Sequence, residues 1–406
     1  MFVGILTVAG LVLSGCQVRE PVTAPPWNEN AGPAPITVPY PQVAPEVWAE
    51  RGSVSLEEPL PDDLDPALVD AIGAGTRAVY ASVYGVDGSP TEVSGAFFIP
   101  KGEPPAGGWP VVAMAHATVG TTTDCAPSVR SDLLGYSPGV VEMVKKGYAV
   151  ALPDYQGLGM PGFHPYLEPR TAAFNVIDSV RAMQQIYPQV SSRWLALGGS
   201  QGGQAAWAAN ELDDFYGGGL ELVGSVAVAP PVDMSPMAEM AYDGTLNTGQ
   251  LGLTPLLLTS FEQMYPDFPI SRFLHGKALE LRYSAVGCTL DAQRMRIQIT
   301  PDDVRPETRE DADMLREMLR ALALPERPLA APMLVINGLN DLLVLPVWVS
   351  TAIARACELG GKIAHYPVPD GGHGNLRADQ KFVEEWAAAR FAGQPAPSNC
   401  PQDTQK

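Results

Sequence analysis

Short apolar runs alternate with stretches of helical periodicity through most of this chain, and this alternation is the strongest constraint on its fold. The runs are apolar at nearly every position, as in strands buried on both faces. They predict strands over 110–116, 148–153, 194–197, 222–229, 333–337 and 363–368, with helices over 171–186, 203–212, 347–358 and 379–391. Repeated strand–helix units predict an α/β fold, with a mostly parallel central sheet flanked by helices. Two alternating segments, 76–86 and 91–99, add an antiparallel pair of strands at its start.

One gap interrupts this rhythm. Between Pro231 and Pro332 no run has the pattern of a buried strand, whereas Met-, Leu- and Phe-rich stretches and a charged helical segment over 307–322 are present. We interpret residues from about 232 to 330 as a helical cap inserted between two sheet strands. The alternative is a set of ordinary surface helices. The sequence therefore predicts one large domain over 51–400 that contains this insertion.

The N-terminus has the pattern of an export signal. Residues 1–13 are almost wholly apolar, yet too short to span a bilayer, which needs roughly 20 residues. The following Leu-Ser-Gly-Cys resembles a bacterial lipoprotein box, in which cleavage leaves a lipidated Cys16. An ordinary secretion signal that ends near Gly15 is the alternative. Residues 17–50 are rich in proline and alanine and predict a semi-extended tether.

Export places the other four cysteines in an oxidising compartment, where an even set forms disulfides. Three pairings are open, and we favour Cys125–Cys288 together with Cys357–Cys400. The net charge of −19 repels phosphate backbones, so nucleic acid is excluded as a partner.

A Gly-Gly-Ser-Gln-Gly motif joins a predicted strand to a predicted helix. This motif fits a sharp turn that exposes the hydroxyl of Ser200 and is typical of a nucleophile. Gly198 and Gly202 would relieve the crowding of such a turn. The N–H of Gln201, at the start of the helix, would point towards a developing oxyanion.

Serine needs a base, and the base needs an acid that orients it. His373 lies in a Gly-rich loop after the last strand, and Asp341 follows the strand before it. The order Ser200, Asp341, His373 is the order expected on this fold. Asp370 is a rival acid, but it lies too near His373 in the sequence to reach the far ring nitrogen. Of the other histidines, His116 is expected to shape the loop after an early strand, His164 to line the pocket, and His275 and His365 to be solvated or satisfied in the core.

A second oxyanion donor is expected from the loop that begins at His116, from the backbone N–H of Thr118 or Ala117. A simple turn is the alternative role for this loop. The sequence carries no metal-ligand spacing, no P-loop and no dinucleotide motif, so we expect neither a metal nor another cofactor.

Several segments resemble the secretory lipase family of α/β-hydrolases. The matching segments are 116–120 with 124–128, 154–159 with 164–167, the Ser200 turn, Asp341 and the His373 loop. The resemblance implies an α/β-hydrolase fold, hydrolysis of carboxylic esters under a helical cap, and oxyanion donors at Gln201 and near Thr118. His116, Asp154, Tyr155 and His164 fall in matched segments and become candidate pocket residues. The chain has Ala117 where the family usually has glycine.

Three functions remain open from the sequence. The first is a lipase or carboxylesterase that acts on a small-molecule or lipid ester. The others are a serine exopeptidase of the same fold and a surface binding protein without catalysis. For each we expect a monomer that contacts a membrane only through an anchor at Cys16.

Overall fold

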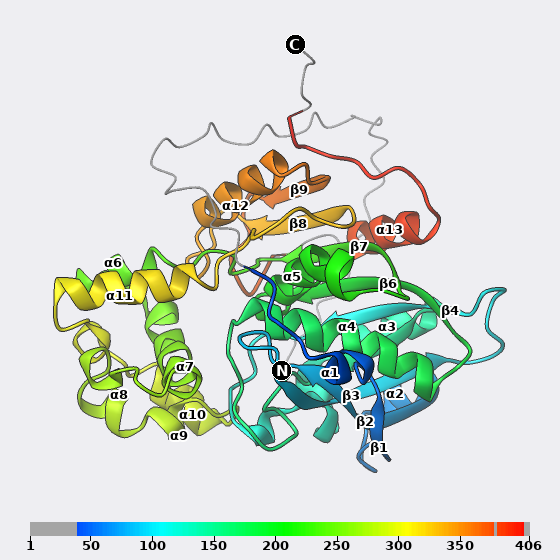
Figure 1. Cartoon of the computed structure of the whole chain (residues 1–406), viewed down its shortest axis with the longest axis horizontal. Helices are drawn as coiled ribbons and strands as arrows, with labels where there is room; N and C mark the ends of the chain where they lie inside the picture. Colours follow the sequence, from blue (N-terminus) through cyan, green and yellow to red (C-terminus); the bar gives the residue numbers. More distant parts are fainter. Residues whose placement is uncertain (1–38, 377–379, 402–406) are drawn as a thin grey trace, which may run out of the picture.

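The computed structural model describes residues 39–376 and 380–401, which contain a nine-stranded sheet (Figure 1). The strand order is β1-β2-β3-β5-β4-β6-β7-β8-β9, and the strands from β5 and β4 to β9 are parallel. The strands are β1 (Val54–Glu58), β2 (Ile72–Val83), β3 (Pro90–Pro100), β4 (Trp109–Ala115), β5 (Ala149–Pro153), β6 (Val190–Gly199), β7 (Glu221–Val228), β8 (Met333–Gly338) and β9 (Ile363–Val368). The predicted mostly parallel sheet is confirmed.

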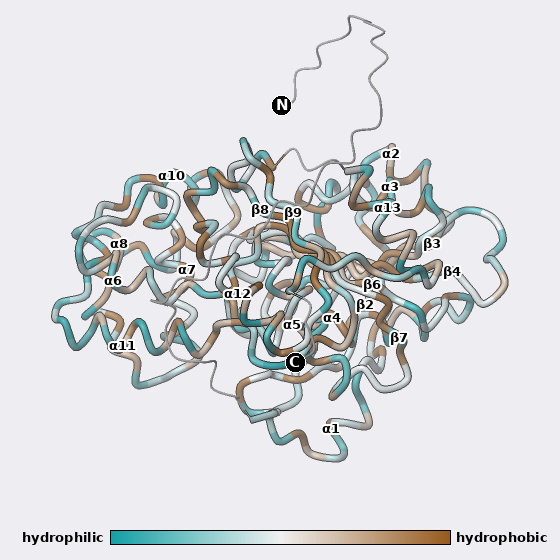
Figure 2. Tube along the Cα trace, turned by 90° about the horizontal axis from the view of Figure 1, so that it is seen from above, coloured by the Kyte–Doolittle hydropathy of each residue, from teal (hydrophilic) through white to brown (hydrophobic). Residues whose placement is uncertain are grey.

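Helices cover both faces of this sheet. Alternate residues of β4 enter different core clusters: Val111 and Ala113 pack on one face, and Val112 and Met114 on the other. The first face carries α4 (Pro169–Ile186), α5 (Gln201–Tyr216) and α12 (Pro346–Glu358), and the second carries α2 (Pro66–Ala71), α3 (Ser137–Lys145) and α13 (Gln380–Phe391). Hydrophobic stretches gather along the central strands, where both faces are covered (Figure 2).

The insertion between β7 and β8 lies beside the sheet (Figure 1). In this part of the described chain the regular elements are all helical, as predicted for the cap. They include α6 (Met237–Tyr242), α7 (Thr248–Met264), α8 (Gly276–Glu280), α9 (Arg282–Ala285), α10 (Leu290–Arg296) and α11 (Arg309–Arg320). Among the residues that the structure describes, no helix combines the length and the apolar character needed to cross a membrane.

The segment before β1 differs from the predicted tether. Residues 39–50 contain α1 (Pro45–Ala49), and the Tyr40 ring stacks on Phe215 of α5 with ring centroids 3.9 Å apart. Trp48 meets the same Phe215 ring edge-on at 5.2 Å. Aromatic side chains therefore attach this segment to the domain, and a tether that extends to residue 50 is wrong for these residues. The predicted signal, Cys16 and the rest of the tether lie outside the described residues.

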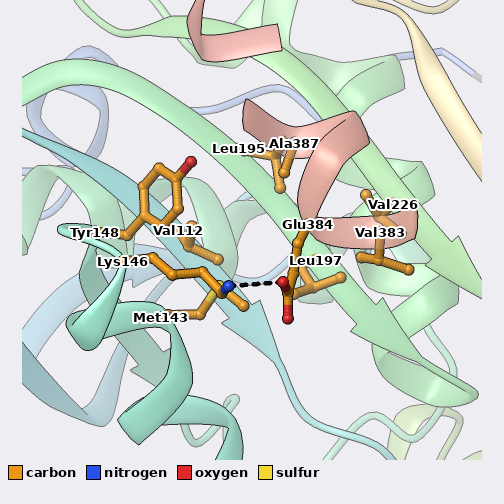
Figure 3. Close-up of a pocket in the computed structure, with 10 residues that line it drawn as sticks. All are labelled: Val112, Met143, Lys146, Tyr148, Leu195, Leu197, Val226, Val383, Glu384 and Ala387. Carbon is orange, nitrogen blue, oxygen red and sulfur yellow. Dashed lines mark ion pairs between the residues drawn. The ribbon is translucent and has the colours of Figure 1, made fainter. Parts of the chain in front are cut away.

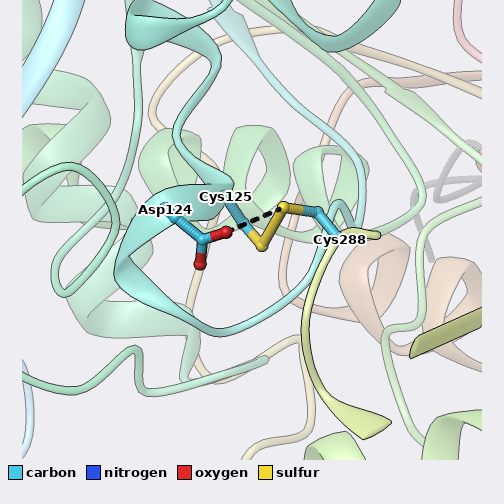
Figure 4. Close-up of side chains that lie close together, drawn as sticks. All are labelled: Asp124, Cys125 and Cys288. Carbon is cyan, nitrogen blue, oxygen red and sulfur yellow. Dashed lines mark hydrogen bonds between the residues drawn. A yellow bond between two sulfur atoms is a disulfide. The ribbon is translucent and has the colours of Figure 1, made fainter. Parts of the chain in front are cut away.

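Two disulfides confirm the favoured pairing of the cysteines. Cys125–Cys288 joins the loop after β4 to the cap between α9 and α10, and Cys357–Cys400 joins α12 to the C-terminal tail. The Asp124 carboxylate lies beside the first bridge (Figure 4). Because both sulfur atoms are bonded to each other, neither is a free thiolate that could hold a metal with Asp124.

A buried carboxyl group of α5 holds the segment through which the chain leaves the cap, and a second buried carboxyl group lies within that segment. Glu211 of α5 accepts hydrogen bonds from the backbone N–H groups of Glu326 and Arg327 at 2.9 and 3.2 Å. Its other oxygen accepts the Trp207 indole N–H at 2.7 Å. Burial raises the pKa of Glu211 to about 8 and that of Glu326 to about 7. Both groups therefore hold protons in the folded protein at pH values where the unfolded chain, with a glutamate pKa of about 4.3, has released them.

These two groups are expected to contribute a fall in the free energy of unfolding as pH rises from about 4.5 to about 8, because in the folded state they hold protons that the unfolded chain has released. Glu326→Gln is expected to flatten the fall, since glutamine keeps the neutral shape of the protonated side chain. Urea unfolding midpoints at pH 5 and pH 8 measure the effect. Glu317→Gln, on the exposed face of α11, is the matched control. An equal pH dependence in wild type and Glu326→Gln would contradict the prediction.

Candidate active site

Ser200 occupies the turn between β6 and α5. Its φ and ψ angles are 53° and −122°, a strained conformation for a residue with a side chain. The N–H of Ser200 donates to the carbonyl of Val228 at 2.7 Å, which fixes the turn to the neighbouring strand. The turn therefore has the sharp form that the sequence motif predicts.

The glycines on either side of Ser200 allow this close packing. A Cβ atom at Gly202 would lie 1.9 Å from the backbone oxygen of Ala115, and one at Gly198 would lie 2.2 Å from the oxygen of Gly202. Neither distance is compatible with a side chain. Both positions consequently require glycine for the turn to sit against β4.

His373 and Asp341 meet Ser200 at the carboxyl ends of the parallel strands. The Nε2 atom of His373 lies 2.9 Å from the Ser200 hydroxyl oxygen, and its Nδ1 atom lies 2.8 Å from Oδ2 of Asp341. The other oxygen of Asp341 accepts the N–H groups of Leu343 and Val344 at 2.8 and 3.0 Å. Because Asp341 can only accept, Nδ1 of His373 carries the proton and Nε2 is free to accept one from Ser200.

The rival acid and the two remaining histidines have other positions. Asp370 is exposed, whereas Asp341 is only 1% exposed. The Nε2 atom of His275 lies 2.7 Å from the Arg305 carbonyl, and Nε2 of His365 lies 2.7 Å from Oδ1 of Asn337. Both histidines are thus satisfied within the protein, as expected.

The three backbone N–H groups expected as oxyanion donors differ in whether they already have a hydrogen-bond acceptor. Gln201 is the first residue of α5, where a backbone N–H has no acceptor within its own helix. Within the described part of the chain, the N–H of Thr118 donates to no protein acceptor. The N–H of Ala117, however, donates to the Tyr136 hydroxyl at 2.6 Å. Ala117 is therefore removed from the candidate donors, and Gln201 and Thr118 remain.

Three candidate pocket residues instead form a buried support under the loop after β4. The Asp154 carboxylate accepts hydrogen bonds from the hydroxyls of Ser94 and Ser128. The two ring nitrogens of His116 lie 2.7 and 3.0 Å from the carbonyls of Ala117 and Asp154, and the Tyr155 hydroxyl donates to the His116 carbonyl at 3.1 Å. These side chains are at most 1% exposed. They were predicted to line an open substrate pocket, and this prediction is wrong for them.

His164 is also buried, but it touches the nucleophile turn. Its Nε2 atom lies 2.8 Å from Nε2 of the Gln201 side chain, and its Nδ1 atom lies 3.0 Å from the Gln156 carbonyl.

Tyr136 was not predicted from the sequence as a site residue, although its hydroxyl accepts the hydrogen bond from the Ala117 N–H. No local pattern marks that role, because the contact depends on how η3 (Leu133–Gly135) and α3 place the tyrosine.

Two cavities lie away from Ser200 and its partners. One, of about 10 Å³, has room for a single water and lies under α3 and α13, where Lys146 and Glu384 pair at 2.6 Å (Figure 3). The other, of about 210 Å³, lies within the cap and is lined by residues of α8, α9, α10 and η5 (Pro301–Val304). Neither includes any of the candidate site residues.

One comparison with known proteins identifies the family, and another shows the fold. A family model described as secretory lipase matches residues 137–399. Candida antarctica lipase A is similar with a TM-score of 0.68 and 17% identity, covering 88% of this chain and 86% of that one. The rice cell wall degrading esterase LipA from Xanthomonas oryzae is similar with a TM-score of 0.64 and 21% identity, covering 84% and 95% of the two chains. No curated protein matches the chain by sequence. The fold is that of the α/β-hydrolases, as the sequence resemblance implied.

Proposed function

Because the chain belongs to the secretory lipase family, we propose that it is an exported serine carboxylic-ester hydrolase that works through an acyl-enzyme on Ser200. One observation carries the serine mechanism: the two hydrogen bonds that join Ser200, His373 and Asp341 in a line, at 2.9 and 2.8 Å. A hydroxyl next to a correctly oriented neutral imidazole is the arrangement that activates serine.

In the proposed reaction the Ser200 oxygen attacks the ester carbonyl while Nε2 of His373 takes the hydroxyl proton. Asp341 keeps the other ring nitrogen protonated and stabilises the imidazolium that forms. The backbone N–H groups of Gln201 and Thr118 donate to the oxyanion. His373 then returns the proton to the leaving alkoxide. A water molecule, deprotonated by the same imidazole, hydrolyses the acyl-enzyme and releases the acid.

The substrate class follows from the family and from the cap. The names of the two structural relatives describe a lipase and an esterase, and both terms refer to ester hydrolysis. The cap of this chain is rich in methionine and leucine, which favours an apolar acyl group. Lipase and esterase activities differ in the length of that group.

Export is supported by three features. The N-terminal residues have the pattern of a signal segment, two disulfides join the four downstream cysteines, and the family description is secretory. Lipidation of Cys16 would make the exported protein a lipoprotein on the cell envelope.

The test is hydrolysis of p-nitrophenyl esters from acetate to palmitate by the mature protein and by Ser200→Ala. We expect activity only in the wild type, together with labelling of Ser200 by a fluorophosphonate probe. The preferred chain length then distinguishes an esterase from a lipase. Faster cleavage of amino-acid p-nitroanilides than of esters would favour a peptidase. A wild type that neither cleaves esters nor reacts with the probe would overturn the proposal.

A further inference from the structure

A three-residue segment, His164-Pro165-Tyr166, touches both sides of the candidate oxyanion site, and we call it the brace segment. Its His164 ring meets the Gln201 side chain at 2.8 Å, and its Tyr166 hydroxyl lies 2.7 Å from Oγ1 of Thr118. Gln201 and Thr118 are far apart in the sequence, yet each is held by one of two neighbouring aromatic side chains.

The contact between His164 and Gln201 has only one satisfactory arrangement of hydrogens. The Gln156 carbonyl accepts, so Nδ1 of His164 must donate and Nε2 must accept from the Gln201 amide. Burial lowers the pKa of His164 to about 3, which keeps the ring neutral at any working pH. The Gln201 side chain is therefore tied to a fixed acceptor, and its backbone N–H begins α5 beside Ser200.

The contact between Tyr166 and Thr118 fixes the opposite side. Tyr166 is 2% exposed, and burial raises the pKa of its hydroxyl to about 12, so that the group stays protonated. The bond holds the Thr118 side chain, and with it the residue whose backbone N–H is left without a protein acceptor in the described chain.

Ser260 of the cap helix α7 holds the brace segment itself. Its hydroxyl oxygen accepts the N–H of Tyr166 at 2.8 Å, and the hydroxyl donates to the His164 carbonyl at 3.3 Å. Ser260 is 1% exposed. At its other end, α7 reaches the turn that holds Asp341, where the Asn247 side chain donates to the Leu342 carbonyl at 2.6 Å. The cap is thus hydrogen-bonded to both sides of the site.

We propose that His164 and Tyr166, fixed by Ser260 of the cap, are positioning residues that set the two oxyanion donors of Gln201 and Thr118. This inference rests on the proposed function. It assigns a role to a cap residue that does not touch the reacting atoms. It also predicts that loosening the brace segment weakens binding of the transition state and not binding of the substrate.

The experiment compares Tyr166→Phe, Ser260→Ala and His164→Phe with wild type on p-nitrophenyl butyrate. Each variant is expected to lower kcat by about 10-fold or more, with KM changed by less than about 2-fold. The loss of kcat should stay smaller than the roughly 10²–10³-fold loss caused by removing an oxyanion donor itself. The inhibition constant of an alkylboronic acid, which mimics the tetrahedral state, is expected to rise by the same factor as kcat falls.

Two matched controls remove hydroxyl groups elsewhere in the cap. Tyr283→Phe breaks an exposed bond to Glu262, and Thr259→Val breaks a buried bond within α7 itself. Both controls should keep wild-type kcat. The double variant Tyr166→Phe with Thr118→Val should be no slower than Thr118→Val alone, because Tyr166 acts through Thr118.

Three outcomes would overturn the inference. Variants of the brace segment that match the controls, or that raise KM without lowering kcat, would contradict it while ester hydrolysis by the wild type upholds the proposed function. A wild type as inactive as Ser200→Ala would remove both proposals. If His164→Phe does not fold, Tyr166→Phe and Ser260→Ala decide the question, since each removes only a hydroxyl.

Discussion

Asp341→Asn is expected to lower kcat for ester hydrolysis by about 10⁴-fold with little change in the fold. The reason is the proton on His373. Oδ1 of Asp341 accepts two backbone N–H groups, so the oxygen of an asparagine would take that place and its NH₂ group would face Nδ1 of His373. The imidazole would then carry its proton on Nε2, where it donates to Ser200 and cannot accept from it.

Asp370→Asn is the matched control for this substitution. Asp370 lies three residues before His373 and is exposed, so its replacement removes the same charge near the same loop. We expect kcat within about 2-fold of wild type, because an exposed charge contributes little. Single-turnover kinetics with p-nitrophenyl butyrate and urea unfolding of each variant measure the two effects. Equal losses in Asp341→Asn and Asp370→Asn would contradict the assignment of Asp341.

The parts of the site that could be predicted from the sequence share one physical origin. Ser200, Asp341 and His373 each follow a strand of a parallel sheet, and parallel strands place their carboxyl ends at one edge. Local sequence patterns were therefore sufficient to predict that these three residues, which are far apart in the chain, lie close together in the fold. The disulfide pairing was predictable for a related reason, since the loop after β4 and the inserted cap had to meet near that edge.

The remaining parts depend on contacts that leave no local pattern. Whether the Ala117 N–H is free depends on the position of Tyr136, and the sequence does not place that hydroxyl. Asp154 has the position of a site residue after β5, yet its carboxylate is satisfied by Ser94 and Ser128 in the core. A position after a strand therefore predicts proximity to the site, whereas burial decides whether the side chain is open to it.

The edges of the domain were the hardest part to predict. β1 is an edge strand with its middle residues exposed, so it lacks the apolar run that marks the central strands. Residues 39–50 have the proline-rich composition of a linker, but Tyr40 and Trp48 provide aromatic surface that packs against Phe215. Composition averages over a segment, whereas two aromatic side chains are enough to attach it.

Replacing both Cys125 and Cys288 with alanine is expected to produce the largest loss of stability. The two residues are 163 positions apart, and chain-entropy arguments give about 5 kcal/mol for a loop of that size. The Cys357–Cys400 pair spans 43 positions, for which the same argument gives about 4 kcal/mol. Urea unfolding of the two double variants under oxidising conditions measures the difference, and equal midpoints would contradict the ordering.

The two bridges are expected to differ more in their effect on activity than in their effect on stability. Next to the first bridge the N–H of Thr121 donates to the Val286 carbonyl at 2.8 Å, so the loop that carries Thr118 is attached to the cap both covalently and by its backbone. Removing this bridge should free that loop and lower kcat by about 10-fold under conditions where the protein stays folded. The second bridge joins α12 to the tail, and its removal should leave kcat unchanged.

If both double variants keep wild-type kcat, the hydrogen bonds of the cap position the loop without the disulfide. Ser260→Ala in the background without the first bridge would then show whether α7 alone is sufficient.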